Sequence, residues 1–315
     1  MKKALAFLFI IICICSMNAC VSPENGGMHK VMLILRSWSS AAAEDMTRGA
    51  NAAARECGLA LTTKAVMGED ERRQQADLIH AAIEKKFDAI IIEPADAAIV
   101  GEAVREAREK GITVVSINSR DEVGQNCTVD IDEKQMADGM VSEIKSLAGG
   151  DAGVLILNCL DGYDNTQRMT DVLSARMEEL PDIGWDSIDF KTGEYAKIES
   201  SLKYSIPENK EKFVVVAQND YAETVAVNLF RSVPDGQNIG LISFAQDADT
   251  ISLLEQGWVD AICMNRNIDI GYRAVRQANE GIEGGNPPDV FIPSVFVTAE
   301  NLYDSDTQEL LFSLN

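Results

Sequence analysis

The chain has 315 residues, of which 46% are hydrophobic and 25% charged, an ordinary composition for a globular protein. The length exceeds what one hydrophobic core usually serves, so we expect two domains. The formal net charge of −22 at pH 7 disfavours nucleic acid and anionic lipid head groups as partners held by general electrostatics. A soluble, self-repelling surface explains this charge without any partner.

The first twenty residues are typical of an export signal. Lys2 and Lys3 precede an apolar run over residues 4–15, which is too short to span a bilayer comfortably but has the length of a signal-peptide core. Residues 16–20 (SMNAC) resemble the end of a bacterial lipoprotein signal, where a small residue precedes a cysteine that is lipidated. Met17 stands where that pattern usually has Leu, and a plain secretory signal cut nearby is the alternative. We predict a signal peptide over 1–20, a lipid on Cys20, a tether over 21–28 and an extracytoplasmic, lipid-anchored body.

The next hundred residues or so alternate strand and helix patterns. Strand patterns cover residues 30–35, 59–66, 88–93 and 112–117, and helical patterns cover 43–57, 69–86 and 97–110. Gly58 and Gly111 end two of the helical patterns as C-caps. A βα unit that recurs at roughly thirty-residue spacing indicates a parallel sheet with helices on both faces.

A second βα series follows a polar break at residues 121–126. A short strand-like piece at 127–131 and a helix at 132–147 precede it, and its strands are expected at 153–159, 187–195, 213–217, 240–244 and 259–264. Residues 267–280 have a helical pattern, residues 289–298 are extended through Pro293, and the acidic tail from Glu300 is weakly specified. Two βα halves joined near residues 120–132 predict an α/β protein of two similar domains.

Motifs for catalysis or for metal binding are missing. The sequence has no nucleophile elbow, phosphate loop, dinucleotide-binding pattern or H-E-x-x-H motif, and its closely spaced aspartates lack the loop that calcium requires. His29 and His80 are expected on the surface. We therefore predict a protein that is not an enzyme, with no catalytic residue, no metal and no cofactor.

The cysteines suggest no metal site either. Three of the seven lie in the signal and anchor, and Cys57, Cys127, Cys159 and Cys263 are widely spaced without a zinc pattern. Cys159 and Cys263 fall on strand patterns and are expected as buried free thiols. A disulfide among the four stays open.

The remaining candidates are polar side chains that follow the strand patterns, where an open α/β sheet presents residues to a ligand. They are aromatic, amide and guanidinium groups, not acid–base pairs: Trp38, Asn118, Arg168, Tyr195, Gln218, Asn219 and Asn265. Aromatic faces pack against the C–H face of a sugar ring, and amide or guanidinium groups hydrogen-bond neighbouring hydroxyls. This mixture favours binding a small polyol over reacting with it.

Four motifs carry a resemblance that covers Lys30 to about Val297. They are residues 114–119 (VVSINS), 167–171 (QRMTD), 216–220 (VAQND) and Gly257 before 259–261 (VDA). In this order and spacing the chain resembles the type I periplasmic sugar-binding proteins of ABC importers, the ribose/galactose/xylose-binding family. The resemblance implies two doubly wound parallel-sheet lobes, a ligand cleft and a hinge of three crossovers near Asp130, Asn265 and Pro293. The implied division is 29–130 plus 265–292 for lobe 1 and 131–264 plus 293–315 for lobe 2.

The resemblance also implies ligand-binding roles. Asn118 matches a hydroxyl-binding group of the first lobe, Arg168 the sugar-binding arginine of the second, and Asn219 the amide of the A-Q-N-D motif. Tyr195 stands where the family often has a stacking aromatic, and Asn265 matches a hinge-side amide. The full predicted ligand-binding set is Trp38, Ser40, Asn118, Arg168, Tyr195, Asn219, Gln246 and Asn265. The structural alternatives are a helix cap for Asn219, a surface helical charge for Arg168 and a core-edge ring for Tyr195.

Two departures from the family bear on the ligand. Residues 41–43 are alanines where the family commonly has aromatics; Trp38 either replaces their stacking face or packs beside Met46. Ala245 stands where the family usually supplies a ligand-binding aspartate, for which Gln246 or Asp247 would have to compensate. The loss of this carboxylate favours a modified sugar, a polyol or another small polar ligand over an ordinary pentose or hexose.

The resulting prediction is an extracytoplasmic solute-binding lipoprotein that delivers a sugar or sugar-like ligand to an ABC permease by hinge closure. A ligand-sensing subunit of a membrane sensor kinase or chemoreceptor is the main alternative. A repressor of the lactose-repressor type would need an N-terminal DNA-binding domain where the signal peptide stands. An α/β enzyme is disfavoured by the missing motifs.

Overall fold

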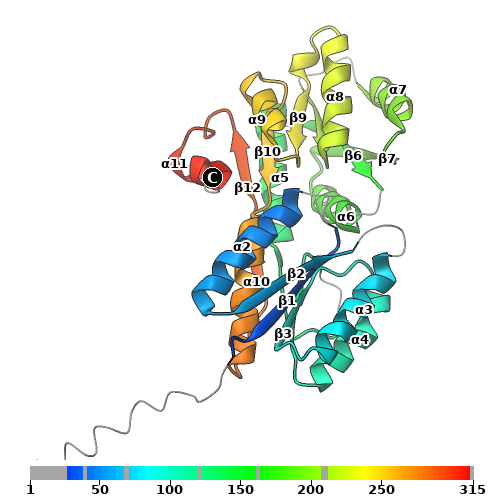
Figure 1. The fold of residues 1–315 in the computed structure, drawn as a ribbon. Helices are drawn as coiled ribbons and strands as arrows, with labels where there is room; N and C mark the ends of the chain where they lie inside the picture. The colour runs from blue at the N-terminus through cyan, green and yellow to red at the C-terminus, as the bar shows by residue number, and fades with distance from the viewer. Residues whose placement is uncertain are drawn as a thin grey trace, which may run out of the picture.

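The computed structural model describes residues 27–37, 41–66, 71–119, 123–149, 151–160, 164–206 and 212–312. These ranges contain two six-stranded sheets, one in each half of an elongated molecule, with helices on both sides of each sheet (Figure 1). The predicted pair of α/β halves is therefore confirmed. The predicted signal peptide, Cys20 and most of the tether lie outside the described residues.

The first sheet has the strand order β11-β5-β4-β3-β1-β2, and its registered neighbours are all parallel. Its strands are β1 (Lys30–Leu35), β2 (Ala60–Ala65), β3 (Ala89–Ile92), β4 (Thr113–Ile117), β5 (Cys127–Ile131) and β11 (Val290–Ile292). The helices of this half are α2 (Ala41–Cys57), α3 (Glu71–Glu84), α4 (Ala97–Glu109) and α10 (Asn267–Ile282).

The second sheet repeats this plan in the order β12-β10-β9-β8-β6-β7, with β12 antiparallel to β10 and the other pairs parallel. Its strands are β6 (Ala152–Cys159), β7 (Ile183–Phe190), β8 (Phe213–Ala217), β9 (Gly240–Ser243), β10 (Ala261–Met264) and β12 (Val295–Thr298). Its helices are α5 (Glu133–Ala148), α6 (Asp164–Glu178), α7 (Tyr195–Ser205), α8 (Asp220–Ser232), α9 (Ala248–Glu255) and α11 (Ser305–Phe312).

The inner strands of each sheet, such as β3, β4 and β8, are buried on both faces, which is why they read as apolar runs, whereas the edge strands β2 and β7 are mostly half-buried or exposed. On β1, Val31, Leu33 and Leu35 join a cluster with side chains of α2 and α10, whereas Met32 and Ile34 join a second cluster with α3 and α4. In the second sheet one face packs against α5 and α6 and the other against α7, α8 and α9. The carboxyl ends of the strands are left to carry the polar connections.

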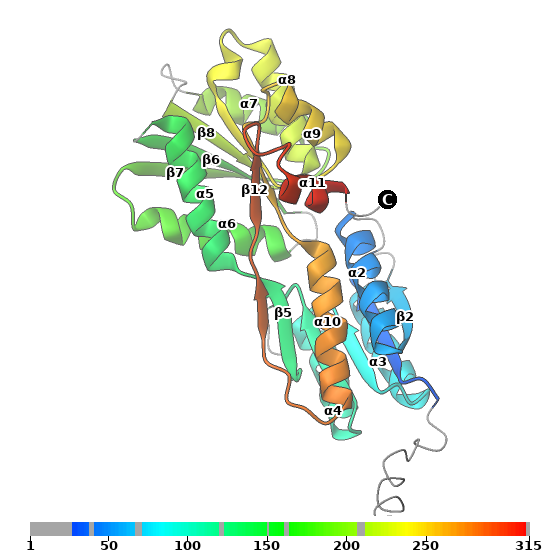
Figure 2. The same ribbon diagram turned by 90° about the vertical axis from the view of Figure 1, so that its left-hand side faces the viewer.

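The chain passes from one sheet to the other after β5, after β10 and between β11 and β12. These connections lie at the waist between the two halves (Figure 2). The assignment of complete residue ranges to two lobes stays a prediction.

Two boundaries differ from the sequence-based expectation. The strand expected over 187–195 runs instead over Ile183–Phe190, because the chain turns at Lys191–Glu194: the Lys191 amide donates to Glu194 Oε2 at 2.9 Å, and Gly193 has φ of +93°. The weakly specified C-terminal segment forms α11, whose Leu310 and Leu311 pack against the core of the second sheet.

In the described part of the chain, no helix combines the length and apolarity needed to cross a membrane. Cys57, Cys127, Cys159 and Cys263 are free thiols, and of these Cys57 alone is partly exposed. The disulfide that the sequence left open is therefore not formed in this structure.

Candidate functional site

An ion-paired cluster joins the carboxyl ends of the two sheets. Arg168, in the first half of α6, places its Nη2 at 3.2 and 3.0 Å from the two carboxylate oxygens of Asp130 on β5. Its Nε lies 2.5 Å from Glu133 Oε1 in the first turn of α5. Both acidic side chains are almost completely buried (1% and 5% exposed), whereas that of Arg168 is 22% exposed. Arg168 is therefore neither a simple surface charge nor free of protein partners.

On the first sheet, Asn118 follows β4 and is held by Glu93, the residue after β3. Asn118 has a φ of +50°, in the left-handed region that Asn tolerates better than most residues. Its Nδ2 donates to Glu93 Oε1 at 3.2 Å and approaches Met46 Sδ at 3.4 Å. The other oxygen of Glu93 accepts from the Arg36 amide at 3.1 Å. Three strand ends are thus tied together around a buried carboxylate.

On the second sheet, Asn219 is the N-cap of α8. Its backbone is extended (φ −158°, ψ 174°), and its Oδ1 accepts from the Ala222 amide at 2.9 Å. This is the capping geometry that satisfies a free amide of the first helical turn. The structure thus confirms the helix cap. The amide donor Nδ2 makes no hydrogen bond to another described residue, so the capping role is compatible with the predicted ligand-binding role.

Gln246 lies on the neighbouring connection, between β9 and α9, which we call the β9–α9 elbow (residues 244–247). Gln246 is half-buried, and the Ala245 amide donates to Ser243 Oγ at 3.0 Å. Asp247 caps α9 by accepting from the Thr250 amide at 2.8 Å. Asp247 is therefore engaged in capping α9, and Gln246 is the other polar side chain of this elbow.

Asn265 belongs to a hydrogen-bonded chain at the waist. Its Oδ1 accepts from Ser294 Oγ at 3.0 Å. Ser294 exchanges two bonds with Gln135, whose Oε1 accepts from the Ser294 amide at 2.9 Å and whose Nε2 donates to the Ser294 carbonyl at 3.2 Å. One residue from each of the three connections between the sheets thus takes part in a single network.

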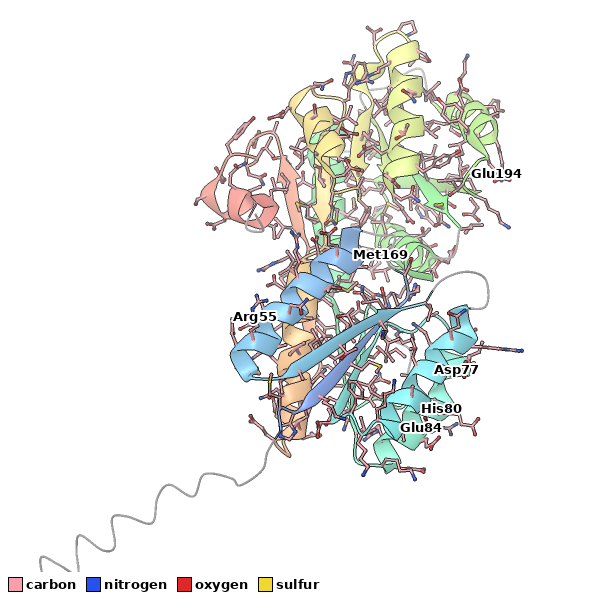
Figure 3. The ribbon with its side chains drawn as sticks, in the orientation of Figure 1. Arg55, Asp77, His80, Glu84, Met169 and Glu194 are labelled. Atoms are coloured by element: carbon pink, nitrogen blue, oxygen red, sulfur yellow. The ribbon has the colours of Figure 1, made fainter. Side chains whose placement is uncertain are left out.

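Tyr195 is not brought together with these residues. The sequence placed it at the end of a strand, but it is the first residue of α7, and its partly buried ring packs against the core of the second sheet. Figure 3 shows its neighbour Glu194 at the outer edge of the upper half, whereas Met169, next to Arg168, lies where the halves meet. Trp38 and Ser40 fall outside the described residues.

Sequence reasoning missed the acidic partners. Glu93, Asp130 and Glu133 are spread over about forty residues and form no motif, so only the fold brings them to Asn118 and Arg168. Gln218, whose Nε2 donates to Thr170 Oγ1 at 2.6 Å, was noticed as a polar strand end; its buried Oε1 has no hydrogen-bond partner among the described residues.

The strand-end side chains described above are amides, carboxylates and a guanidinium, groups that donate or accept hydrogen bonds. The described residues contain no cluster of three or more side chains able to hold a metal ion. Burial raises the pKa of the Cys127 thiol to about 12 and also raises that of Cys263, so both stay protonated at neutral pH. His29 precedes β1, and its Nδ1 lies 3.1 Å from Asp88 Oδ1. His80 lies on α3 near Glu106, away from the waist (Figure 3).

Comparison with known proteins gives a family match and a shared fold. A family model described as a periplasmic binding protein domain matches residues 31–286. An ABC transporter solute-binding protein from Burkholderia graminis in complex with D-arabinose superposes with a TM-score of 0.74 at 18% identity, covering 89% of this chain and 99% of that chain. One from Agrobacterium vitis with bound D-fucose has a TM-score of 0.74 at 16% identity, covering 90% and 100%.

A third structure, described as an ABC transporter and LacI family transcriptional regulator from Brachyspira murdochii, has a TM-score of 0.73 at 17% identity and covers 90% of this chain and 99% of that chain. No curated protein shows significant sequence similarity to this chain. At these identities the solved structures establish the two-sheet fold.

Proposed function

The chain belongs to the periplasmic binding protein domain family, and from this premise we propose that it captures a small sugar-like ligand outside the cytoplasm and delivers it to an ABC importer. The observation that carries the proposal is the Arg168–Asp130 contact, which joins α6 of one half to β5 of the other. Strand ends this close are able to share one small ligand, and crevices at the carboxyl ends of strands are where open α/β sheets bind ligands.

The residues at the strand ends suit a polyhydroxylated ligand. A hydroxyl group both donates and accepts hydrogen bonds, and amides such as those of Asn118, Asn219 and Gln246 offer both functions. Arg168 keeps N–H groups beyond those that face its two carboxylates, and we assign these to the ligand. Trp38 and Ser40 complete the proposed set from the end of β1, and Tyr195 stays a prediction with a weaker geometric basis.

Capture would proceed by closure of the two halves about the waist. A ligand that contacts both halves only in the closed form shifts the equilibrium toward that form by its difference in affinity for the two states. We assign the axis of this motion to the network of Gln135, Asn265 and Ser294, because its hydrogen bonds join the connections between the two sheets. No covalent step is involved.

A thermal-shift screen tests the ligand class. The panel contains D-arabinose, D-fucose, D-allose, galactose, amino sugars and linear polyols, and a hit is confirmed by calorimetry. A ligand at about 100 times its Kd stabilises the folded form by about 2.7 kcal/mol, which raises the melting temperature by several degrees. If no member of the panel binds, the sugar assignment is wrong; if the hit is chemically converted during incubation, the binding-only function is wrong.

The identity of the membrane protein that binds the ligand-loaded form distinguishes transport from sensing. We propose a membrane permease, and the test is crosslinking of the ligand-loaded protein in membranes from cells that express it, with identification of the crosslinked protein by mass spectrometry. A permease supports import, whereas a histidine kinase or chemoreceptor supports the sensory alternative.

The lipid anchor on Cys20 is tested by detergent phase partition. Wild-type protein is expected in the detergent phase, and Cys20→Ala in the aqueous phase, because a lipidated cysteine is the membrane attachment in this proposal. Equal partition of the two proteins would point to a plain secretory signal.

A further inference from the structure

Glu223 is a buried carboxyl group beside the β9–α9 elbow. It lies in the first turn of α8, one helical turn after Asn219, and is 3% exposed. Its Oε1 lies 3.1 Å from the hydroxyl of Thr250, a fully buried residue in the first turn of α9. Glu223 thus bridges the two helices that follow β8 and β9.

The hydroxyl of Thr250 lies between two carboxyl groups. Its Oγ1 is 3.1 Å from Glu223 Oε1 and 3.2 Å from Asp247 Oδ1. A threonine hydroxyl has one hydrogen, so it donates fully to one of these oxygens while the other faces its lone pairs. The arrangement lacks one hydrogen unless one of the two acids is protonated.

Burial and helix capping decide which acid carries that hydrogen. Asp247 is exposed, and its Oδ1 already accepts the Thr250 amide at the N-terminus of α9. Glu223 is buried, and desolvation raises its pKa; the negative charges of Asp247 and Asp220 raise it further, and hydrogen bonds from Ser243 and Thr250 act in the opposite sense. Asp247 and Asp220, the charged groups that raise this pKa, are both acidic.

We propose that Glu223 is a positioning residue whose protonated carboxyl donates to Thr250 Oγ1 while Thr250 donates to Asp247 Oδ1, so that this relay holds the β9–α9 elbow in place. Ser243 ties the same elbow from the strand side, because its Oγ accepts the Ala245 amide. The consequence for ligand binding, through Gln246, rests on the proposed function; the relay itself does not.

The sign of the pH dependence follows from the proton. The relay is complete while Glu223 is protonated, and it is lost as the pH rises through the raised pKa of the folded protein. An exposed glutamate has a pKa of about 4.3, so the pH range over which the relay is lost lies above this value. Loss of one hydrogen bond of this kind opens the elbow roughly fivefold to tenfold more often.

The test needs no ligand and therefore separates the relay from the proposed function. Carboxyl 13C signals are followed by NMR between pH 4 and 9, and hydrogen exchange of the amides of residues 245–250, corrected for intrinsic rates, is measured over the same range. In wild type the Glu223 signal should titrate above the ordinary glutamate range, and protection of the elbow should fall with it.

Two variants at the same position complete the design. Glu223→Gln keeps a donor of the same shape at every pH, so its elbow should stay protected and lose the pH dependence, whereas Glu223→Ala should be unprotected throughout. The proposal is overturned if Glu223 in the wild type titrates at the ordinary glutamate pKa. It is also overturned if the elbow amides of Glu223→Gln keep the wild-type pH profile of exchange, or exchange as fast as those of Glu223→Ala. The 13C titration and Glu223→Gln decide the question even if Glu223→Ala does not fold.

Discussion

In the proposed function, Asn219 serves structure and ligand binding through different atoms. Its carbonyl oxygen caps α8, and its amide nitrogen has no partner among the described residues. An alanine substitution removes both groups at once, so it cannot distinguish the two roles. Aspartate keeps the capping oxygen and replaces the amide donor, and it is also a good N-cap.

We expect Asn219→Ala to lower the free energy of unfolding by about 1 kcal/mol through the lost cap. Asn219→Asp should leave stability within a few tenths of a kcal/mol of wild type. Both variants should bind the ligand found by the thermal-shift screen more weakly, because both lack the amide donor. Urea denaturation and calorimetry measure the two quantities separately. Unchanged affinity in Asn219→Asp would limit this residue to its capping role.

The cysteines give a second test at the level of single residues. Cys57 is partly exposed, whereas Cys127, Cys159 and Cys263 are buried, and the pKa of Cys127 is raised to about 12. Because the thiolate is the reactive form, the native protein should be alkylated by iodoacetamide at Cys57 long before the buried three at pH 8. Peptide mapping by mass spectrometry follows each cysteine. Rapid labelling of Cys263 in native protein would contradict the packing of β10.

Sequence reasoning identified several polar strand ends but not their protein partners. Asn118 and Arg168 were recognised because each follows a strand in a recurring βα unit. Their carboxylate partners depend on the register of different strands, and Asp130 is 38 residues from Arg168 in the chain. Local patterns contain no information on which strand ends become neighbours at such separations, so the ion-paired cluster emerged only from the fold.

At the level of elements, the βα alternation was predictable because a strand buried on both faces and an amphipathic helix have different hydrophobic periods. The end of β7 was not predictable, because the apolar and aromatic residues on either side of Lys191–Glu194 fit one extended strand. The turn there depends on a hydrogen bond to the Glu194 side chain and on the positive φ of Gly193. The register of α2 against α10 was also invisible from sequence, although it is set by two glycines.

These glycines allow α2 and α10 to touch backbone to backbone. A Cβ on Gly49 would come within 1.9 Å of the Ile268 carbonyl oxygen, and one on Gly271 within 1.9 Å of the Met46 carbonyl oxygen. In both cases the obstacle is a helix backbone, which cannot rotate away as a side chain can. Any larger residue therefore forces the two helices apart.

We expect Gly49→Ala and Gly271→Ala each to destabilise the protein by roughly 2–3 kcal/mol, because overpacking a tight interface costs that much. Gly101→Ala on α4 is the matched control, since its Cβ would approach no closer than 3.8 Å to the Val123 carbonyl oxygen. This control should be neutral or more stable by about 0.5–1 kcal/mol from helix propensity. Equal effects of the three substitutions in urea denaturation would mean that the helix crossing is not tight.

At the scale of the whole molecule, the described residues form two halves of similar topology, which are joined at three points and bridged by the Arg168 ion pair. The Arg168 guanidinium spans them, because Asp130 belongs to the first sheet and α6 packs on the second. A second arginine–aspartate ion pair, which also involves α6 but lies within one half, offers a comparison. Arg176 on α6 contacts Asp138 on α5 at 2.6 Å, but both helices pack on the second sheet and both side chains are at least a third exposed.

The two arginines should therefore differ when each is replaced by methionine. Arg168→Met leaves two buried carboxylates without the guanidinium that faces them, and we expect a loss of about 3 kcal/mol in the free energy of unfolding. Arg176→Met should change stability little, because solvent screens an exposed pair. Urea denaturation of both variants, with Asp130→Asn and the double variant Arg168→Met/Asp130→Asn, gives the coupling energy between Arg168 and Asp130, which meet across the two halves. A coupling energy near zero, or equal losses in the two arginine variants, would show that the cluster does not link the halves.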